Sequence, residues 1–281
     1  MSQPDGDPLA DLRAYAARIP TGAAFCGETA ARIYGLPLPM KREALESNKP
    51  EDGQADKHVP IHVAAALGRS KPRGKGITGY RLSEALFKTR TFARLPVLQP
   101  IETFITCCRH LSVDEAVVML DALLTNKEIY PGMKLRYRPV TTIDKVEARL
   151  AEVGPVQGIR VARDALVLAR VRVASPMETK LRLLLVRGGL PEPEVNGIVY
   201  TDTGERIAEV DLLYRDAKIA IEYEGDGHRT NKKIFRNDLV RERRLRQAGY
   251  AYIRVTIEEM GETSTLVADL RTRLTGGASL P

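Results

Sequence analysis

Hydrophobic and polar residues in the last third of the chain follow a spacing that changes from helical to strand-like. Apolar residues recur at helical spacing over Pro176–Arg187, and a Gly-Gly pair then ends the predicted helix. Three strand-like segments follow, at Glu194–Tyr200, Arg206–Tyr214 and residues 218–224. A short polar stretch separates the last two, so we expect them to form a hairpin.

The remainder of this region completes an α/β pattern. A long basic helix is predicted over residues 231–248, a strand over 251–257 and a final helix over 264–274. The order αβββαβα predicts an α/β fold with a mixed central sheet flanked by helices. The hairpin strands are apolar throughout except for their carboxylates, which is typical of strands buried on both faces.

The first half of the chain has a different pattern and predicts an α+β domain. Helical spacing covers residues 9–19, 27–36, 100–108 and 112–124, and a strand-like segment lies near residues 58–65. A polar stretch containing Gly and Pro, residues 152–158, precedes another apolar, helix-like segment. We therefore expect an N-terminal accessory domain over residues 1–160 and a second domain over 161–281.

Composition narrows the class of protein. A chain of 281 residues can form two domains with their own cores, and 43% hydrophobic with 28% charged residues is typical of globular proteins. We expect a cytoplasmic protein without membrane contacts, since no apolar run is long enough to span a bilayer and residues 1–8 do not resemble a secretory signal. Cys26, Cys107 and Cys108 form no CxxC pair and are predicted to be core residues rather than zinc ligands.

The positive charge is concentrated in two segments. The net charge of +7 favours a polyanionic partner. Residues 68–81 are predicted to form a flexible basic loop, and the exposed face of the helix at 231–248 is strongly positive. An ordinary solvated surface is the alternative to phosphate binding. The residues expected to contact nucleic acid are Arg69, Lys71, Arg73, Lys75, Lys232, Lys233, Arg236 and Arg241.

Acidic residues in the predicted hairpin point to a metal site. Side chains alternate along a strand, so Glu222 and Glu224 share one face, and Glu209 and Asp211 share another. A turn at residues 215–218 places Asp211 opposite Glu222, about 5 Å apart between Cβ atoms. Buried carboxylates need a compensating cation, and Mg²⁺ or Mn²⁺ binds such oxygen ligands.

Other roles for these acids remain open at this point. They could lie at strand ends and pair with Lys218 or with the arginine-rich helix. Glu178 follows Ser175 and Pro176 in the pattern of a helix capping box, which is a structural role.

The segments SPMETKLRLLLVRGGLP, AEVDLLY and KIAIEYEGDGH together resemble the PD-(D/E)XK nucleases, in the branch similar to very-short-patch-repair endonucleases of actinobacterial type. The first half of the chain resembles the first half of the same family and, more weakly, AbiEi-type antitoxins. The resemblance implies a restriction-endonuclease-like domain in which Asp211 and Glu222 bind the metal, with Glu178 as a direct or water-mediated ligand. His228, and Asp238 on the basic helix, also match positions of the family's pattern.

One position departs from this family. The third motif residue is usually Lys, whereas this chain has Glu224. Either Glu224 binds the metal or orients water, or a cation such as Lys218 or Lys232 takes the place of the motif Lys.

These features predict a Mg²⁺- or Mn²⁺-dependent endonuclease, in repair or defence, that nicks or cuts DNA by hydrolysing phosphodiester bonds. The DNA is expected to be double-stranded, the N-terminal domain is expected to bind it, and no small-molecule cofactor is expected. His228 would act as general base or protonate the leaving oxygen. The alternatives are an inactive DNA-binding regulator, antitoxin-like, on a nuclease fold, and a metal-dependent enzyme acting on RNA or nucleotides.

Overall fold

The structure is a computed structural model that describes residues 9–39, 60–127, 129–131, 133–134, 139–225 and 232–276. The chain divides into two compact units. The N-terminal unit comprises Met1–Leu124 and Gly132–Ala169, and the C-terminal unit comprises Thr125–Pro131 and Arg170–Pro281. The short strands β6 (Ile129–Tyr130) and β7 (Met133–Lys134) pair with each other in a two-stranded sheet.

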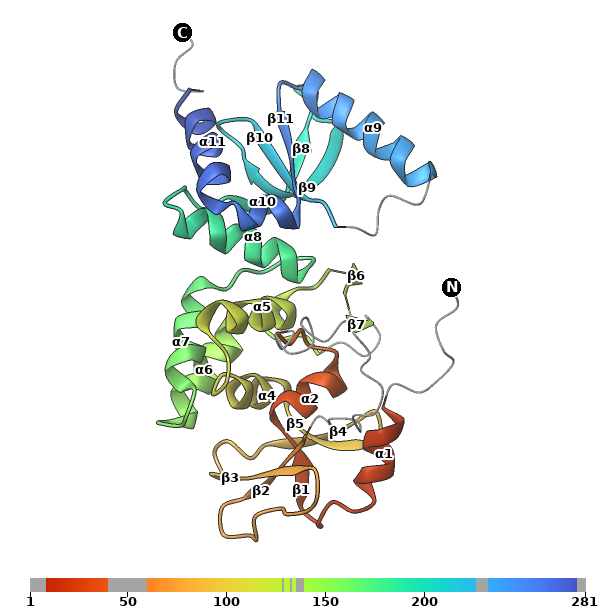
Figure 1. The fold of residues 1–281 in the computed structure, drawn as a ribbon, viewed down its shortest axis with the longest axis vertical. Helices are drawn as coiled ribbons and strands as arrows, with labels where there is room; N and C mark the ends of the chain where they lie inside the picture. Colours follow the sequence, from red (N-terminus) through yellow and green to blue (C-terminus); the bar gives the residue numbers. More distant parts are fainter. Residues whose placement is uncertain are drawn as a thin grey trace, which may run out of the picture. The chain divides into compact units, whose positions relative to one another are not determined.

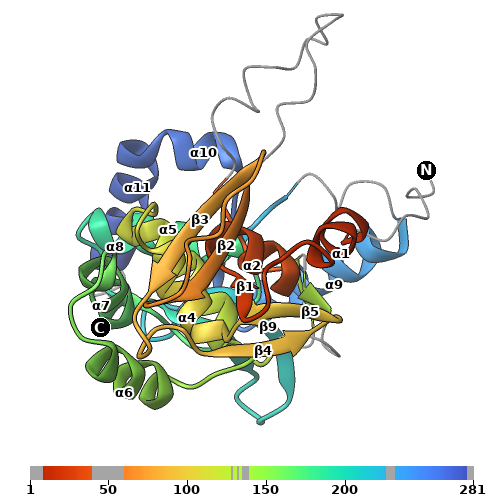
Figure 2. The ribbon, with the colours of Figure 1, turned by 90° about the horizontal axis from the view of Figure 1, so that it is seen from below.

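The N-terminal unit is built around a mixed five-stranded sheet with the order β3-β2-β1-β5-β4. Strand β1 pairs antiparallel with β2 and parallel with β5, whereas β2 pairs parallel with β3. Figure 2 shows β2 and β3 side by side, and β4 beside β5. The strands are β1 (Ala23–Phe25), β2 (Ile61–Ala66), β3 (Ile77–Leu82), β4 (Thr89–Phe92) and β5 (Leu95–Leu98).

Helices complete this unit and follow the predicted pattern closely. Helix α2 packs on β2 and α4, and α7 packs on α5 and α6. Ser112 and Glu115 form a capping box before α5, with Glu115 Oε2 accepting from the Ser112 backbone N–H at 2.8 Å. The helices are α1 (Ala10–Ala16), α2 (Gly27–Tyr34), α4 (Pro100–Cys107), α5 (Val113–Leu124), α6 (Ile143–Val153) and α7 (Ile159–Leu168).

The first half differs from the expectation in two places. The basic loop was predicted to reach Arg81, but β3 occupies its last part, and Gly79 lies where an added Cβ would be 1.9 Å from the Pro72 carbonyl oxygen. Helix α7 contacts α5 and α6, so the unit boundary falls after Ala169 rather than after residue 160. The three cysteines are buried and unbonded, as expected for core residues.

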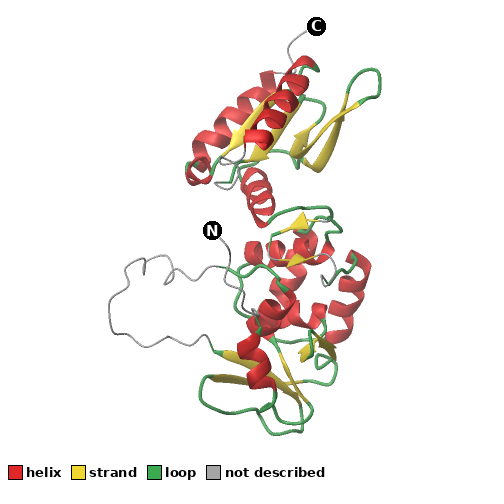
Figure 3. Ribbon diagram, turned by 90° about the vertical axis from the view of Figure 1, so that its right-hand side faces the viewer, coloured by secondary structure: helices red, strands yellow, loops and turns green. Residues whose placement is uncertain are grey.

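The C-terminal unit contains the predicted mixed sheet. Its order is β11-β10-β9-β8, in which β9 is antiparallel to both neighbours and β10 is parallel to β11 (Figure 1). Figure 3 shows these strands as a layer with helices beside it. The strands are β8 (Glu194–Tyr200), β9 (Arg206–Tyr214), β10 (Ile219–Tyr223) and β11 (Ala251–Val255), and the helices are α8 (Pro176–Arg187), α9 (Lys232–Gln247), α10 (Ile257–Gly261) and α11 (Thr263–Gly276).

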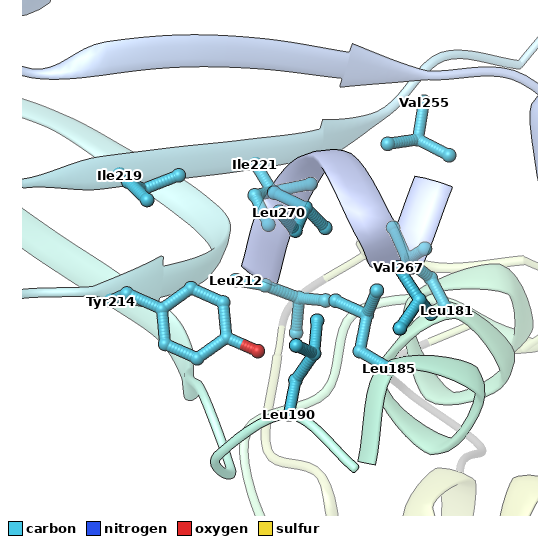
Figure 4. Close-up of a cluster of buried hydrophobic side chains, with 10 residues drawn as sticks. All are labelled: Leu181, Leu185, Leu190, Leu212, Tyr214, Ile219, Ile221, Val255, Val267 and Leu270. Atoms are coloured by element: carbon cyan, nitrogen blue, oxygen red, sulfur yellow. The ribbon is translucent and has the colours of Figure 1, made fainter. Parts of the chain in front are cut away.

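Apolar side chains cover both faces of this sheet. On one face, Leu181 of α8 and Leu270 of α11 pack against Leu212 and Ile221 (Figure 4). On the other, Leu245 of α9 packs against Val210 and Ala220. The fold is therefore α/β with two mixed sheets, and the acidic residues of the C-terminal sheet lie within a packed framework.

Candidate acidic site

Glu178 is held at the start of α8 by local backbone chemistry. Ser175 caps the helix, with its Oγ accepting from the Glu178 backbone N–H at 3.2 Å, and Pro176 is the first helical residue. The Glu178 carboxylate accepts from the Ala174 N–H at 2.9 Å and from Asn196 Nδ2 at 2.8 Å. It is only 5% exposed. The Ser175 half of the predicted capping box is therefore present, whereas the buried Glu178 carboxylate accepts from the N–H of the residue before the cap.

Asp211 lies near the centre of β9, beside the end of β10. The hairpin pairs Leu212 with Ile221 and Tyr214 with Ile219, and the same register continued by one residue places Asp211 opposite Glu222. The turn spans residues 215–218, as predicted. Asp211 Oδ2 accepts from the Tyr223 backbone N–H at 2.9 Å, which fixes the carboxylate at the strand end.

Glu178 and Asp211 influence each other's charge. Burial raises the pKa of both carboxyls, and the pKa of Asp211 reaches about 7 because the negative charge of Glu178 adds to the effect of burial. Hydrogen bonds and the nearby cation Lys127 oppose these shifts. The two acids, Glu178 buried and Asp211 half-buried, thus form a pair of like charge that is incompletely neutralised by the protein.

Glu222 has a different environment from the one predicted. Its carboxylate forms an ion pair with the Arg241 guanidinium of α9 and accepts a hydrogen bond from the Tyr252 hydroxyl of β11. Its side chain is 14% exposed. For this residue the alternative of a pairing with the arginine-rich helix is the observed one, and Arg241 is a partner of an acid in addition to being an expected phosphate contact.

The remaining predicted site residues lie apart from the pair or outside the described residues. Glu224 is half-buried, and its backbone N–H donates to Val255 O at 2.9 Å. The pKa of Arg254 is raised mainly by its hydrogen bond with Tyr252, and the charge of Glu224 adds a smaller effect. His228 lies outside the described residues. Helix α9 includes Lys232, Lys233, Arg236 and Asp238, but the described side chains of this helix begin at Leu239. Leu239 is 48% exposed.

The carboxylates do not converge on one point. Among the described residues, no group of three or more His, Cys, Asp or Glu side chains is arranged to hold a metal ion. Glu178 and Asp211 form a two-carboxylate site, and Glu222 could join it only by leaving Arg241. A divalent cation would match the donor set of this pair, because both side chains offer hard oxygen ligands and the pKa of both carboxyls is raised without a cation.

Sequence reasoning did not find a cluster of cations beside these acids. Lys127 Nζ, Arg172 Nη2 and Arg206 Nη2 all lie at the Glu209 carboxylate, two residues before Asp211. Lys127 is separated from Glu209 by 82 residues in sequence, so no local spacing could have signalled it. Lys218, which was suggested as a replacement for the motif Lys, lies before β10 and donates to Ala248 O at 3.4 Å.

The predicted basic loop of the N-terminal unit is exposed. Arg69, Lys71, Arg73 and Lys75 precede β3 and have solvent-exposed side chains. The surface charge of this loop is therefore available to a polyanion.

Within the described ranges, no helix has the length and apolar character that crossing a membrane requires.

Comparison with known proteins identifies relatives without an assigned function. No model of a known protein family matches the chain, and no solved structure gives a significant match. Two uncharacterized proteins of Mycobacterium tuberculosis, MT2308 of strain CDC 1551 / Oshkosh and Rv2248 of strain ATCC 25618 / H37Rv, are each 25% identical over 238 residues. The match covers 85% of this chain and 76% of each relative. The chemistry of the site must therefore carry any functional conclusion.

Proposed function

We propose that the C-terminal unit is a metal-dependent endonuclease of the PD-(D/E)XK type that hydrolyses phosphodiester bonds in double-stranded DNA. The observation that carries this proposal is the pair of the buried Glu178 and the half-buried Asp211. Asn196 of β8 holds Glu178, and the residues on either side of Asn196 pair with the residues on either side of Asp211 on β9. Keeping two like charges close together and out of water is unfavourable unless a cation joins them. A site with this property suits a protein that binds a divalent metal.

Each residue of the acidic site would have a separate role. Glu178 and Asp211 would hold Mg²⁺ or Mn²⁺, and Glu222 would complete the set after exchanging its contact with Arg241. When bound, such an ion supplies a water of lowered pKa and offsets charge on the phosphate. Glu224 would orient that water, and His228 would transfer a proton. Asn196 and the Ala174 N–H would keep the Glu178 carboxylate in place.

DNA is the proposed substrate because of where the positive charge lies. Helix α9 directly follows the acidic hairpin in the chain and carries many basic residues. The exposed loop before β3 adds Lys71 and Lys75 on the N-terminal unit. Contacts of this kind bind the phosphate backbone without reading sequence.

The test is cleavage of supercoiled plasmid DNA by the full-length protein with Mg²⁺ or Mn²⁺. Asp211→Ala and Glu222→Ala should each lower the rate by about a hundredfold or more, as removal of a group that stabilises the transition state does. Asp216→Ala is the matched control, since Asp216 is exposed on the turn of the same hairpin. Cleavage at the wild-type rate by both Asp211→Ala and Glu222→Ala would refute the proposed site.

A second function is favoured by one observation. Because Glu222 is paired with Arg241 and Tyr252, the fold satisfies this acid without a metal. That arrangement suits a DNA-binding regulator on an inactive nuclease fold. Such a protein would bind duplex DNA in a salt-dependent manner but would not cleave it, whichever divalent ion is added. Calorimetry would show no heat of Mg²⁺ or Mn²⁺ binding.

A further inference from the structure

The Glu209 carboxylate is surrounded by more positive charge than it can neutralise. Lys127 Nζ forms an ion pair with its Oε1, Arg206 Nη2 lies 3.1 Å from its Oε2, and Arg172 Nη2 lies 3.6 Å from its Oε1. One carboxylate faces three cations here, an excess of two positive charges before the nearby acids Glu178 and Asp211, whose charges also act on Lys127, are counted. This excess is located two residues along β9 from Asp211.

Lys127 reaches this place through an unusual path of the chain. Its segment, Thr125–Pro131, belongs to the C-terminal unit, although the residues on both sides of the segment belong to the N-terminal unit. Its side chain is 21% exposed. Burial and the charge of Arg172 lower the pKa of Lys127, while Glu178 and Asp211 raise it. The ammonium group therefore lies within the field of both acids of the pair.

Two backbone positions link the cations to the acids. Arg172 and Asn196 both have positive φ, 70° and 48°, a conformation that is costly for Arg and that Asn adopts more readily than most residues other than glycine. Arg172 Nη2 donates to Asn196 O at 3.2 Å, and the Asn196 amide holds Glu178. The strained positions thus connect the positive cluster with the acidic pair.

We propose that Lys127, Arg172 and Arg206 form an anion-binding cluster that contacts a phosphate group beside Glu178 and Asp211. Lys127 is the member whose charge acts on both acids. The identity of the anion as a DNA phosphodiester rests on the proposed function. In the free protein Glu209 balances part of the positive charge, and a bound phosphate takes over that role.

The experiment measures binding of a fluorescein-labelled DNA duplex by anisotropy, in EDTA and at several salt concentrations. Lys127→Gln should weaken binding roughly eightfold at 0.1 M salt and reduce the slope of log K against log salt by about 0.9, because one phosphate contact is lost. Lys127→Arg should restore most of the affinity. Lys180→Gln, at an exposed lysine of α8, is the charge-matched control and should match wild type.

A second variant has the opposite expected sign. Glu209→Gln leaves the three cations uncompensated, so duplex affinity should rise several-fold and the salt slope should become steeper. A merely structural ion pair would give lower stability and no gain in affinity. With a melting curve to show that Glu209→Gln is folded, tighter binding by this variant is informative even if Lys127→Gln folds poorly.

The outcomes separate this inference from the proposed function. Duplex binding that changes as described, without cleavage under any divalent ion, would support the anion-binding cluster and refute the nuclease. Cleavage by wild type combined with unchanged affinity and slope in Lys127→Gln would overturn the cluster and leave the nuclease standing. Failure of the wild-type protein to bind the duplex at all would also overturn the cluster.

Discussion

At the scale of single residues, the acidic pair determines how stability depends on pH. Burial, and to a smaller extent the negative charge of Glu178, raises the pKa of Asp211 from 3.8 to about 7. The folded protein therefore binds a proton at Asp211 more tightly than the unfolded chain does. Stability is therefore highest with Asp211 protonated and falls as pH rises from about 4 through about 7. The loss is complete above that range.

This gives a prediction for Asp211→Asn. At pH 8 without divalent ions the variant should be more stable than wild type by roughly 2–4 kcal/mol, since the neutral amide avoids the cost of the buried charge. At pH 4 the difference should disappear. Urea unfolding at both pH values measures it, and equal stabilities at pH 8 would contradict the raised pKa. Added Mg²⁺ should stabilise wild type and leave Asp211→Asn unchanged.

The ion pair of Glu222 gives a second prediction. Arg241→Gln leaves the partly buried Glu222 carboxylate without its cation and with the Tyr252 hydroxyl as a hydrogen-bond donor, so the free energy of unfolding should fall by about 1–3 kcal/mol. If Glu222 is a metal ligand, millimolar Mg²⁺ should recover part of this loss. The double variant Glu222→Gln with Arg241→Gln is the control and should show no recovery. Unfolding curves with and without Mg²⁺ decide between a ligand and a purely structural acid.

At the scale of elements, α8 shows how much local sequence determines. Pro176 at the first helical position, Ser175 as cap and the Gly-Gly end gave bounds that the structure reproduces, and the strands Glu194–Tyr200 and Arg206–Tyr214 were also predicted with the observed limits. Each has strong signals at both ends. Strand β1 and helix α10 were missed because such short elements carry too little periodicity and depend on tertiary contacts.

The cap of α8 connects this element to the site, and it gives a third prediction. Ser175→Ala removes the acceptor for the Glu178 N–H and should lower the free energy of unfolding by about 1 kcal/mol. Because the same turn positions the Glu178 carboxylate, the proposed cleavage rate should fall by more than the loss of folded protein explains. Thr256→Ala removes the equivalent cap of α10 and is the matched control. If both variants keep the wild-type rate at saturating Mg²⁺, Glu178 does not depend on its cap for position.

At the scale of the whole molecule, the path of the chain explains what the sequence could not predict. Contiguous domains at 1–160 and 161–281 assign Lys127 to the wrong unit, because Thr125–Pro131 belongs to the C-terminal unit. The register of Asp211 and Glu222 followed from a short turn and strand alternation. The Glu222–Arg241 pair and the cations at Glu209 depend on contacts between distant segments, which periodicity does not encode.

The last prediction concerns the contribution of the N-terminal unit to DNA binding. If its exposed loop contacts phosphates, replacing Lys71 and Lys75 together by Gln should reduce the salt slope of duplex binding by about 1.8, since two contacts are lost. Stability should change by less than about 0.5 kcal/mol, because both side chains are exposed. The matched control replaces Lys88 and Lys145, which are exposed elsewhere on the same unit. Equal slopes for the two double variants would mean that the loop charge acts only through the general field of the protein, and that binding rests on the C-terminal unit.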